Sequence, residues 1–263
     1  MKLGFIGTGN MGSAMITGII KNKIIASDEI IGADLMEAAR QKVQQLGIKV
    51  TDSATEVVKE ADIIVLSIKP QFYESVIAEI KSYIKDEQIV ITLAPGKTLK
   101  WVEQNFGKNV KIVRTMMNLP AMVGEGMTAM CSNEYITQDE LAYVKKILSS
   151  VGRVEVIPER LMDVVVAVSG SSPACVFVMI EAMADAAVSG GMPRAQAYQF
   201  AAQAVLGSAK VVLDTGKHPG ELKDMVCSPA GTTIEGVRIL EKMGFRSTII
   251  EALKACEEKS KLL

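Results

Sequence analysis

Residues 3–12 read Leu-Gly-Phe-Ile-Gly-Thr-Gly-Asn-Met-Gly, an apolar run that passes directly into a GxGxxG pattern. The apolar run 3–6 predicts a strand, and the segment after it predicts a helix over about 10–21. A glycine-rich turn between a strand and a helix admits a pyrophosphate, which the N–H groups at the helix N-terminus attract. We therefore predict that the chain begins with a dinucleotide-binding βαβ unit. The alternative is an ordinary strand-to-helix turn that holds no ligand.

Apolar runs continue to alternate with amphipathic segments through the first half of the chain. The strand candidates are 29–33, 62–68, 88–93, 111–116, 126–131 and 152–157, and the clearest further helices are 35–46 and 137–149. Strands that alternate with helices form right-handed βαβ units around a parallel sheet. The expected fold class is therefore α/β, with a Rossmann-type domain over residues 1–158.

After about Pro158 the pattern becomes helical and rich in Ala and Met. Helices are expected over 159–169, 173–189, 193–214, 219–226, 232–243 and 246–261. From Leu161 to Ala209 there is no lysine, and helices that are apolar on several faces are usually buried. We expect residues 159–263 to form an all-α domain that dimerises; a monomeric bundle is the alternative.

Charge and composition exclude several classes of function. The formal charge is −1, which argues against a nucleic-acid partner, and the single histidine, His218, excludes a His-rich metal site. The four cysteines have no CxxC spacing, so no metal site is expected. Free cysteines of this kind are typical of a reducing compartment, so we expect a cytoplasmic location. No signal peptide is expected, and the apolar stretch 164–180 is interrupted at 169–173, which argues against a membrane span.

Polar residues follow several of the predicted strands. Asp34 follows the second strand, where a carboxylate can bond the ribose of NAD or cap the next helix. The segments 67–70 and 93–96 each end a strand with proline close by, at the edge where open α/β sheets bind ligands. Asn118 follows another strand, and the sequence leaves open whether it anchors a cofactor amide or a turn between domains.

The densest polar stretch of the helical half is residues 218–233. Ser228 and Pro229 end one helix there, and Gly231, Thr232 and Thr233 begin another. Free N–H groups and two hydroxyls at a helix N-terminus suit a carboxylate ligand. Simple helix capping by Ser and Thr is the alternative.

Together these motifs resemble the pyrroline-5-carboxylate reductase family over essentially the whole chain. The resemblance is carried by residues 5–12, 67–70, 114–126, 168–174 and above all 218–233, continuing to 244–247. It implies a Rossmann domain joined to a helical domain that dimerises, with dimers that can assemble into decamers. It also implies reduction of the C=N bond of L-1-pyrroline-5-carboxylate by NADPH or NADH, which gives L-proline in the last step of proline biosynthesis.

The resemblance also implies roles for individual residues. The cofactor-binding set that it implies is Ile6, Gly7, Thr8, Gly9, Asn10, Met11, Asp34, Ser67, Lys69, Pro70, Leu93, Ala94 and Pro95. Ile68 and Asn118, which also follow predicted strands, complete the predicted set. The substrate-binding set is Glu159, Val226, Ser228, Gly231, Thr232 and Thr233, with Thr233 orienting the imine nitrogen. The chain departs from the family pattern at Met117, Leu119, Ser172, Cys175 and Ala230, and the acidic Asp34 replaces residues that suit a 2′-phosphate. These departures concern the choice of cofactor and the fit of the substrate.

The scarcity of acid–base side chains favours reduction of an imine. Hydride delivery to a carbonyl leaves an alkoxide that needs a general acid, whereas delivery to a protonated imine leaves a neutral amine. The rival enzyme, a β-hydroxyacid dehydrogenase-like reductase, would need a lysine early in the helical domain, and none is present there. A non-catalytic dinucleotide-binding regulator is the other alternative, but it would have no reason to keep residues 228–233.

Overall fold

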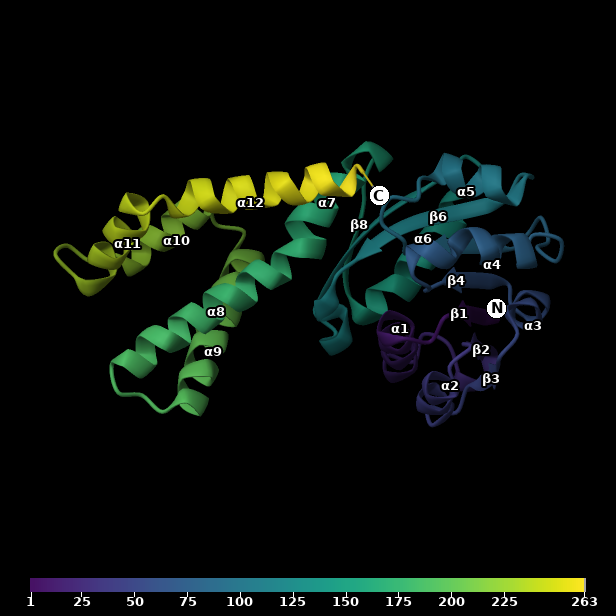
Figure 1. Ribbon diagram of the computed structural model, residues 1–263, viewed down its shortest axis with the longest axis horizontal. Helices are drawn as coiled ribbons and strands as arrows, with labels where there is room; N and C mark the ends of the chain where they lie inside the picture. The colour runs from purple at the N-terminus through teal and green to yellow at the C-terminus, as the bar shows by residue number, and fades with distance from the viewer. Residues whose placement is uncertain (263) are drawn as a thin grey trace. The chain divides into compact units, whose positions relative to one another are not determined.

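The computed structural model describes residues 1–262, which divide into two compact units (Figure 1). The first unit comprises Met1–Ser171 together with the end of the chain from Cys256, and the second comprises Ser172–Ala255. Each unit is described by itself below.

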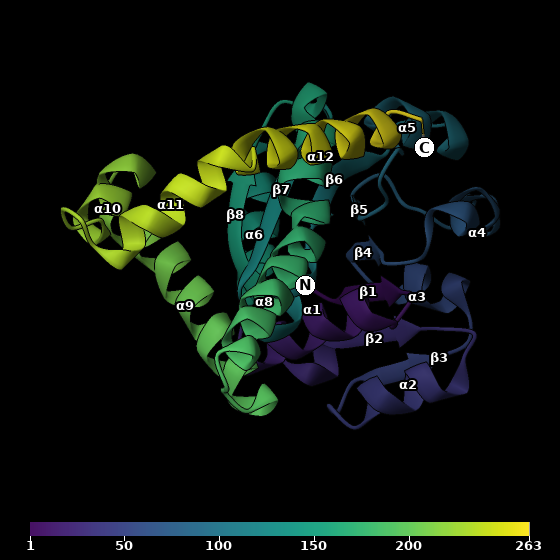
Figure 2. The same cartoon turned by 60° about the vertical axis from the view of Figure 1, so that its left-hand side comes forward.

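The first unit is built on a sheet whose strand order is β3-β2-β1-β4-β5-β6-β7-β8 (Figure 2). The strands are β1 (Leu3–Ile6), β2 (Ile30–Ala33), β3 (Lys49–Thr51), β4 (Ile63–Leu66), β5 (Ile89–Thr92), β6 (Lys111–Met117), β7 (Gly126–Ser132) and β8 (Gly152–Val156). The strand pairs are parallel except for β6 and β7, which run antiparallel. The expectation of a parallel sheet is therefore confirmed for the part that carries the glycine-rich turn. It is wrong for β7 and for β8, which is parallel to β7, because β7 follows β6 through a connection too short for a crossover helix.

Helices cover both faces of this sheet. One face carries α3 (Ala54–Glu60), α4 (Tyr73–Ile80) and α5 (Leu99–Phe106), and the other carries α1 (Asn10–Lys21), α2 (Glu37–Gln44) and α6 (Gln138–Leu148). Alternate residues of each strand face opposite ways, so Ile64 and Leu66 pack under α4 while Ile63 and Val65 pack with the α1 side. Burial on both faces explains why the central strands are continuously apolar.

The structure corrects two of the predictions from the sequence and adds one strand. The second helix begins at Glu37 rather than at residue 35, because residues 34–36 form a turn held by the Asp34 side chain. Strand β3, which is short and only half-buried, was not predicted. The expected break at 169–173 is also wrong, since the chain is helical without interruption from Glu159 to Ser189. A π-helical turn at Val166–Ser171 joins α7 (Met162–Val165) to α8 (Ser172–Ser189).

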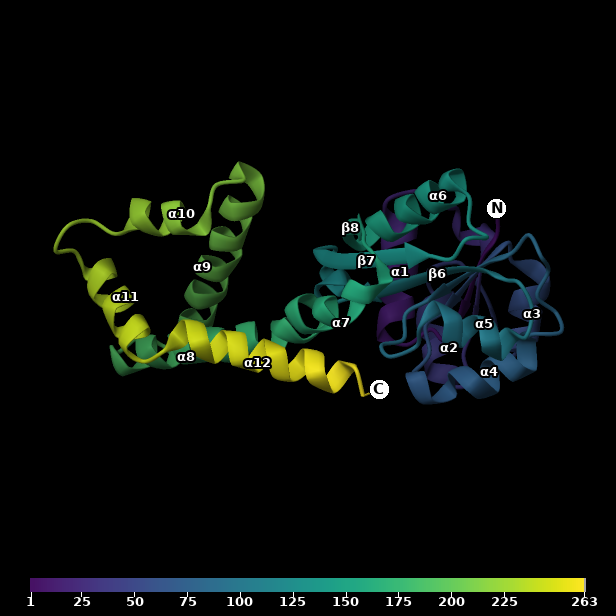
Figure 3. The same ribbon diagram turned by 90° about the horizontal axis from the view of Figure 1, so that it is seen from above.

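The second unit consists of α8, α9 (Arg194–Thr215), α10 (Pro219–Val226), α11 (Thr232–Lys242) and most of α12 (Phe245–Ser260) (Figure 3). Helices α8 and α9 pack against each other, and the buried residues within 172–255 are three alanines, Ala184, Ala197 and Ala201. Large apolar side chains are instead exposed on these helices, among them Phe177, Val178, Phe200, Leu206, Leu213 and Ile250. An apolar surface of this extent on a single chain marks an interaction site.

By length and composition, one helix within residues 1–262 could cross a membrane: the continuous helix Glu159–Ser189. Its mean hydropathy is 1.8 over the most apolar window, and 11% of that window is buried within the chain. The sequence argument against a span relied on a break that the structure does not contain. Whether this helix spans a membrane or packs against protein therefore depends on what covers its exposed apolar side chains.

Candidate active site

The glycine-rich turn connects β1 to α1 at the carboxyl edge of the sheet. Gly7 has a φ of +95°, a conformation that only glycine adopts readily, and its N–H donates to the Ala33 carbonyl at 2.7 Å. A Cβ on Gly7 would lie 2.6 Å from the Ser67 carbonyl oxygen, and one on Gly12 would lie 2.4 Å from the Gly7 oxygen. Both glycines are therefore required by close backbone approach.

Gly9 differs from these two glycines because a Cβ there would meet nothing within 4 Å. Gly9 is exposed, it caps α1 without a side-chain hydrogen bond, and the first turn of α1 carries no acidic residue. The N-terminus of a helix carries positive potential and free N–H groups, and the space beside Gly9 leaves room for a pyrophosphate to approach them. The residues present fit the diphosphate of a dinucleotide.

Asp34 lies beside the same turn. One carboxylate oxygen accepts the Thr8 N–H at 2.8 Å, and the other accepts the Met36 N–H at 3.0 Å. The Arg40 guanidinium donates to the backbone carbonyls of Asp34 and Leu35. The helix-cap interpretation of Asp34 is wrong, because α2 is capped by Met36 without a side-chain bond. The carboxylate instead links the end of β2 to the glycine-rich turn.

The next predicted cofactor segments lie at the ends of β4 and β5. The Ser67 N–H donates to the Ile6 carbonyl at 2.9 Å, and the Ser67 hydroxyl donates to the Gly7 carbonyl, which joins β4 to the turn. Ile68, Lys69 and Pro70 then lead into a short 3-10 turn, while Leu93, Ala94 and Pro95 follow the neighbouring strand β5. The structure therefore brings the 6–11, 34, 67–70 and 93–95 segments to one edge of the sheet.

The side-chain amide of Asn118 is hydrogen-bonded to other residues of the chain. Its Oδ1 accepts the Met127 N–H at 2.8 Å, and its Nδ2 donates to the carbonyl and hydroxyl oxygens of Ser169 at 3.2 Å. Pro173 has no N–H to give to the carbonyl four residues earlier, which is that of Ser169. Asn118 thus bonds a carbonyl to which Pro173 cannot donate. Of the two sequence interpretations of Asn118, the geometry favours the turn anchor.

Glu159 lies in the first unit and is bonded there. Its Oε1 accepts from the Arg114 guanidinium at 2.8 Å and from the Leu99 N–H at 2.7 Å. Arg114 is a buried residue of β6, and Leu99 begins α5. Burial, followed by the negative charge of Glu159, raises the pKa of the nearby Cys131 thiol to about 12. Glu159 thus has clear structural partners, which the sequence reasoning did not foresee.

The remaining predicted substrate residues lie together in the second unit. The loop 227–231 joins α10 to α11, with Val226 at the end of α10 and Thr232 and Thr233 in the first turn of α11 (Figure 3). Gly231 caps α11 without a side-chain bond, and a Cβ on it would lie 2.3 Å from the Ser228 hydroxyl oxygen. Ala230 adopts a φ of +56°, a left-handed conformation that a side chain disfavours. The loop therefore presents the α11 N-terminus beside the Ser228 hydroxyl.

His218 has a structural role in this unit. Its Nδ1 accepts the Gly220 N–H at 3.0 Å, which caps α10. Within residues 1–262, no group of three or more His, Cys, Asp and Glu side chains gathers where a metal ion could be held.

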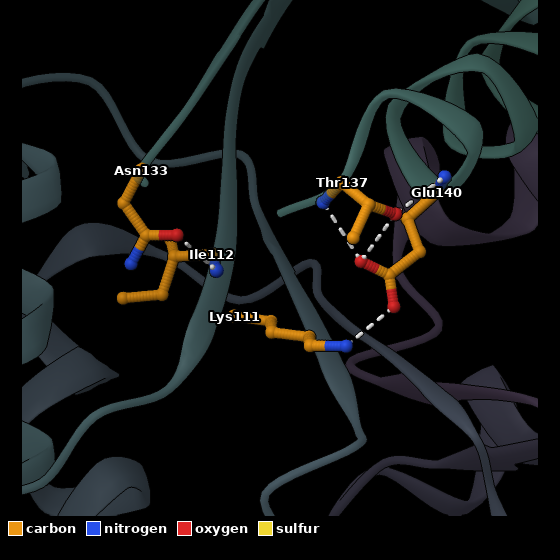
Figure 4. Close-up of polar contacts among 5 residues, drawn as sticks. All are labelled: Lys111, Ile112, Asn133, Thr137 and Glu140. Atoms are coloured by element: carbon orange, nitrogen blue, oxygen red, sulfur yellow. Dashed lines mark hydrogen bonds and ion pairs between the residues drawn. The ribbon is translucent and has the colours of Figure 1, made fainter. Parts of the chain in front are cut away.

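A separate cavity of about 530 Å³ lies at the opposite edge of the sheet. It is lined by Asp86, Lys108, Asn109, Lys111 and Tyr135. Lys111 begins β6 and pairs with Glu140, which also closes a capping box with Thr137 (Figure 4). Burial alone would raise the pKa of Glu140, but the bonds from Lys111 and Thr137 hold it below its ordinary value. These contacts serve to fasten α6 to the sheet.

Comparison with known proteins agrees with this arrangement. Residues 159–263 match a family profile described as pyrroline-5-carboxylate reductase dimerisation, and residues 2–96 match one described as NADP oxidoreductase, coenzyme F420-dependent. The pyrroline-5-carboxylate reductase of Escherichia coli K12 is 50% identical over 263 residues, which cover 100% of this chain and 98% of the relative. The chain belongs to the pyrroline-5-carboxylate reductase family.

Other members of the pyrroline-5-carboxylate reductase family support the assignment. The Methanosarcina acetivorans enzyme is 44% identical, over 100% of this chain and 97% of its own. The Plasmodium falciparum structure, determined with NADP bound, has a TM-score of 0.90 at 34% identity, over 100% of this chain and 97% of that one. The Coxiella burnetii structure has a TM-score of 0.92 at 31% identity, over 99% and 97%. The predicted fold, a Rossmann-type domain followed by a helical domain, is confirmed.

Proposed function

We propose that this protein reduces the C=N bond of L-1-pyrroline-5-carboxylate to give L-proline, with NADPH or NADH as the hydride source. The full-length match to reductases of that name carries the proposal, since it covers the glycine-rich turn and the loop before α11 alike. In a cell this reaction would be the last step of proline biosynthesis. A cytoplasmic location, without membrane or nucleic-acid partners, is part of the same proposal.

Residues 1–158 are proposed to bind the dinucleotide. The N–H groups around Gly9 hold the pyrophosphate, and the Asp34 carboxylate faces the adenine ribose. The ends of β4 and β5, with Ser67–Pro70 and Leu93–Pro95, line the rest of the cofactor. A bound reduced nicotinamide supplies the hydride, so the protein itself contributes position and polarity.

Residues 159–263 are proposed to bind the substrate and to dimerise. The N–H groups at the start of α11 from Thr232 onward receive the carboxylate, since the Gly231 N–H donates to the Ser228 carbonyl at 3.1 Å, and Ser228 adds a hydroxyl beside them. Thr233 orients the protonated ring nitrogen. No general acid is needed when that nitrogen arrives protonated, which suits a chain that has no lysine from Leu161 to Ala209.

The exposed apolar surface of the second unit is proposed to be covered by a second copy of the chain. Within 172–255 the buried residues are alanines, while large apolar side chains of α8, α9 and α12 are exposed. The dimerisation profile matched at 159–263 supports a homodimer, and a decamer of such dimers is the larger assembly proposed. Light scattering on the purified chain tests this, and a monomer at micromolar concentration would contradict it.

One assay tests the proposed reaction. Oxidation of NADPH and of NADH is followed with pyrroline-5-carboxylate, with the oxo form of a hydroxyacid, and without substrate. We expect imine-dependent oxidation and L-proline as the product. Oxidation with the oxo acid would favour the β-hydroxyacid dehydrogenase-like alternative, and no turnover with either substrate would favour a binding protein.

A further inference from the structure

A fully buried tyrosine stands where two of the proposed cofactor segments begin. Tyr73 opens α4 and is 0% exposed. Its hydroxyl donates to the Leu66 carbonyl at 2.6 Å and accepts the Leu93 N–H at 3.0 Å. Leu66 is the last residue of β4, and Leu93 is the first residue after β5. One side-chain oxygen therefore joins the carboxyl ends of neighbouring strands.

The position of this hydroxyl corresponds to a missing rung of the ladder. Where β4 and β5 begin to pair, the Ile89 N–H donates to the Asp62 carbonyl at 3.1 Å. The rungs of a parallel ladder recur every two residues, so the register places a rung between the Leu93 N–H and the Leu66 carbonyl. Both groups bond the Tyr73 hydroxyl instead. The Tyr73 hydroxyl therefore bridges the two strand ends in place of a direct rung.

We propose that Tyr73 is a positioning residue which, by holding the ends of β4 and β5 apart, sets the width of the cofactor site between segments 67–70 and 93–95. This inference rests on the proposed function for the identity of the ligand. Burial keeps the pKa of Tyr73 above its ordinary value, so the hydroxyl remains a donor throughout the working pH range. Strand ends that separate at this edge of an α/β sheet open the crevice in which ligands bind.

The alternative is that Tyr73 only fills the space beneath α4. Its ring belongs to the same buried cluster as Leu66, Ile77 and Val90, and Tyr73→Phe would keep the ring in that cluster. The substitution removes the hydroxyl alone, so Leu66 and Leu93 must close a direct rung or lose a hydrogen bond. A purely structural role would lower stability and leave both Michaelis constants unchanged. A positioning role changes the constant for the cofactor.

The test compares the full-length enzyme with Tyr73→Phe and with the matched control Tyr83→Phe. Tyr83 is exposed, and its ring lies against the Lys59 ammonium. We expect Tyr73→Phe to raise the KM for NADPH or NADH at least threefold while the KM for pyrroline-5-carboxylate stays within twofold. The control should leave both constants unchanged. A rise of less than threefold in the cofactor KM overturns the inference, whatever happens to the melting temperature.

A second measurement uses the unsubstituted enzyme, in case Tyr73→Phe does not fold. If the hydroxyl couples the strand ends to the cofactor, binding of NADPH must slow hydrogen exchange at the Leu93 amide, because such coupling is reciprocal. Exchange at Leu93 that is unchanged on binding overturns the inference. An unsubstituted enzyme that oxidises neither cofactor in the presence of the imine refutes the proposed function itself, and so the two failures are distinguishable.

Discussion

The Arg114 guanidinium donates to the Glu159 carboxylate across 2.8 Å, with Arg114 buried in β6 and the Glu159 side chain 32% exposed. The same Glu159 oxygen accepts the first N–H of α5. One carboxylate therefore fastens a central strand and a helix to the segment that enters the helical half. This contact is the kind of ion pair whose loss leaves a buried charge without compensation.

Glu159→Gln should destabilise the protein. Removing one partner of a buried pair costs about 3–5 kcal/mol, and the partial exposure of Glu159 reduces the expected loss to about 2 kcal/mol. Urea unfolding at a fixed protein concentration measures it. Glu235→Gln is the matched control, because Glu235 pairs with Arg238 on the exposed side of α11 and should cost less than about 1 kcal/mol. Equal losses in the two variants would contradict the account.

Because the Cys131 thiol is buried, we expect the protein to lose stability at high pH. The pKa of this thiol is raised from 9.0 to about 12, so the folded state holds the proton more tightly than the unfolded state. That contribution is fully present below pH 9 and is lost as the pH rises toward 12. Between pH 8 and pH 10 the unsubstituted protein should lose about 1.4 kcal/mol more than Cys131→Ala.

Denaturant unfolding of both proteins at the two pH values measures this difference. The cavity that the alanine leaves lowers stability equally at both pH values, so it cancels in the comparison. Tyr73, whose pKa is also raised, is present in both proteins, so its titration cancels as well. Parallel losses of stability in the two proteins would show that Cys131 does not titrate differently on folding.

The choice between NADH and NADPH is expected to depend on Asp34. A carboxylate beside the adenine ribose repels a 2′-phosphate, so Asp34→Asn should raise kcat/KM for NADPH relative to NADH by about tenfold, or about 1.4 kcal/mol. Asparagine keeps one oxygen for the Thr8 N–H and gives up only the bond from the Met36 N–H. Asp28→Asn, at an exposed position before β2, is the control. A ratio within twofold of the original would mean that Asp34 does not face the ribose.

Local patterns in the sequence predicted the first unit well. The run 3–6 became β1 as expected, since a buried parallel strand leaves an unmistakable apolar signature and glycines mark the turn that follows. Strand β3 escaped prediction because one exposed and two half-buried residues carry no such signal. Strand β7 was predicted at 126–131, but its antiparallel direction was not, because strand direction depends on the connection and on pairing rather than on composition.

Other features depend on contacts between distant residues. The sequence around Pro173 predicts a helix break, but Asn118, distant in sequence, bonds the Ser169 carbonyl and the helix continues through a π-helical turn. Likewise, nothing near Tyr73 in the sequence indicates that its hydroxyl enters the β4–β5 ladder. The candidate cofactor segments could be named from spacing, whereas the side chains that fix their geometry could not.

The hydroxyl of Thr233 is expected to matter for the imine. A hydrogen bond to a charged group contributes about 1.5–3 kcal/mol, so Thr233→Ala should lower kcat/KM for pyrroline-5-carboxylate at least tenfold. Thr233→Ser, which keeps the hydroxyl, should restore most of the loss. Thr215→Ala is the control, because that hydroxyl bonds only the Val211 carbonyl and the Lys217 N–H at the end of α9. A loss of less than twofold with Thr233→Ala, about 0.4 kcal/mol, would rule out the orienting role.

Gly231 offers the sharpest test of the carboxylate site. A Cβ there would lie 2.3 Å from the Ser228 hydroxyl oxygen, so Gly231→Ala must push Ser228 away from the α11 N-terminus or displace the loop itself. Because the substrate carboxylate is expected to bind these N–H groups, the KM for pyrroline-5-carboxylate should rise at least tenfold. The KM for the cofactor should remain within twofold, since the glycine-rich turn belongs to the other unit.

Gly236→Ala provides the matched control within the same helix. A Cβ on Gly236 meets nothing within 4 Å in the chain, and alanine in a helix interior is favoured over glycine by about 0.5–1 kcal/mol. This variant should therefore keep both Michaelis constants and be at least as stable as the unsubstituted protein. If Gly231→Ala left the substrate KM unchanged while Gly236→Ala behaved as expected, the carboxylate would have to bind elsewhere than the start of α11.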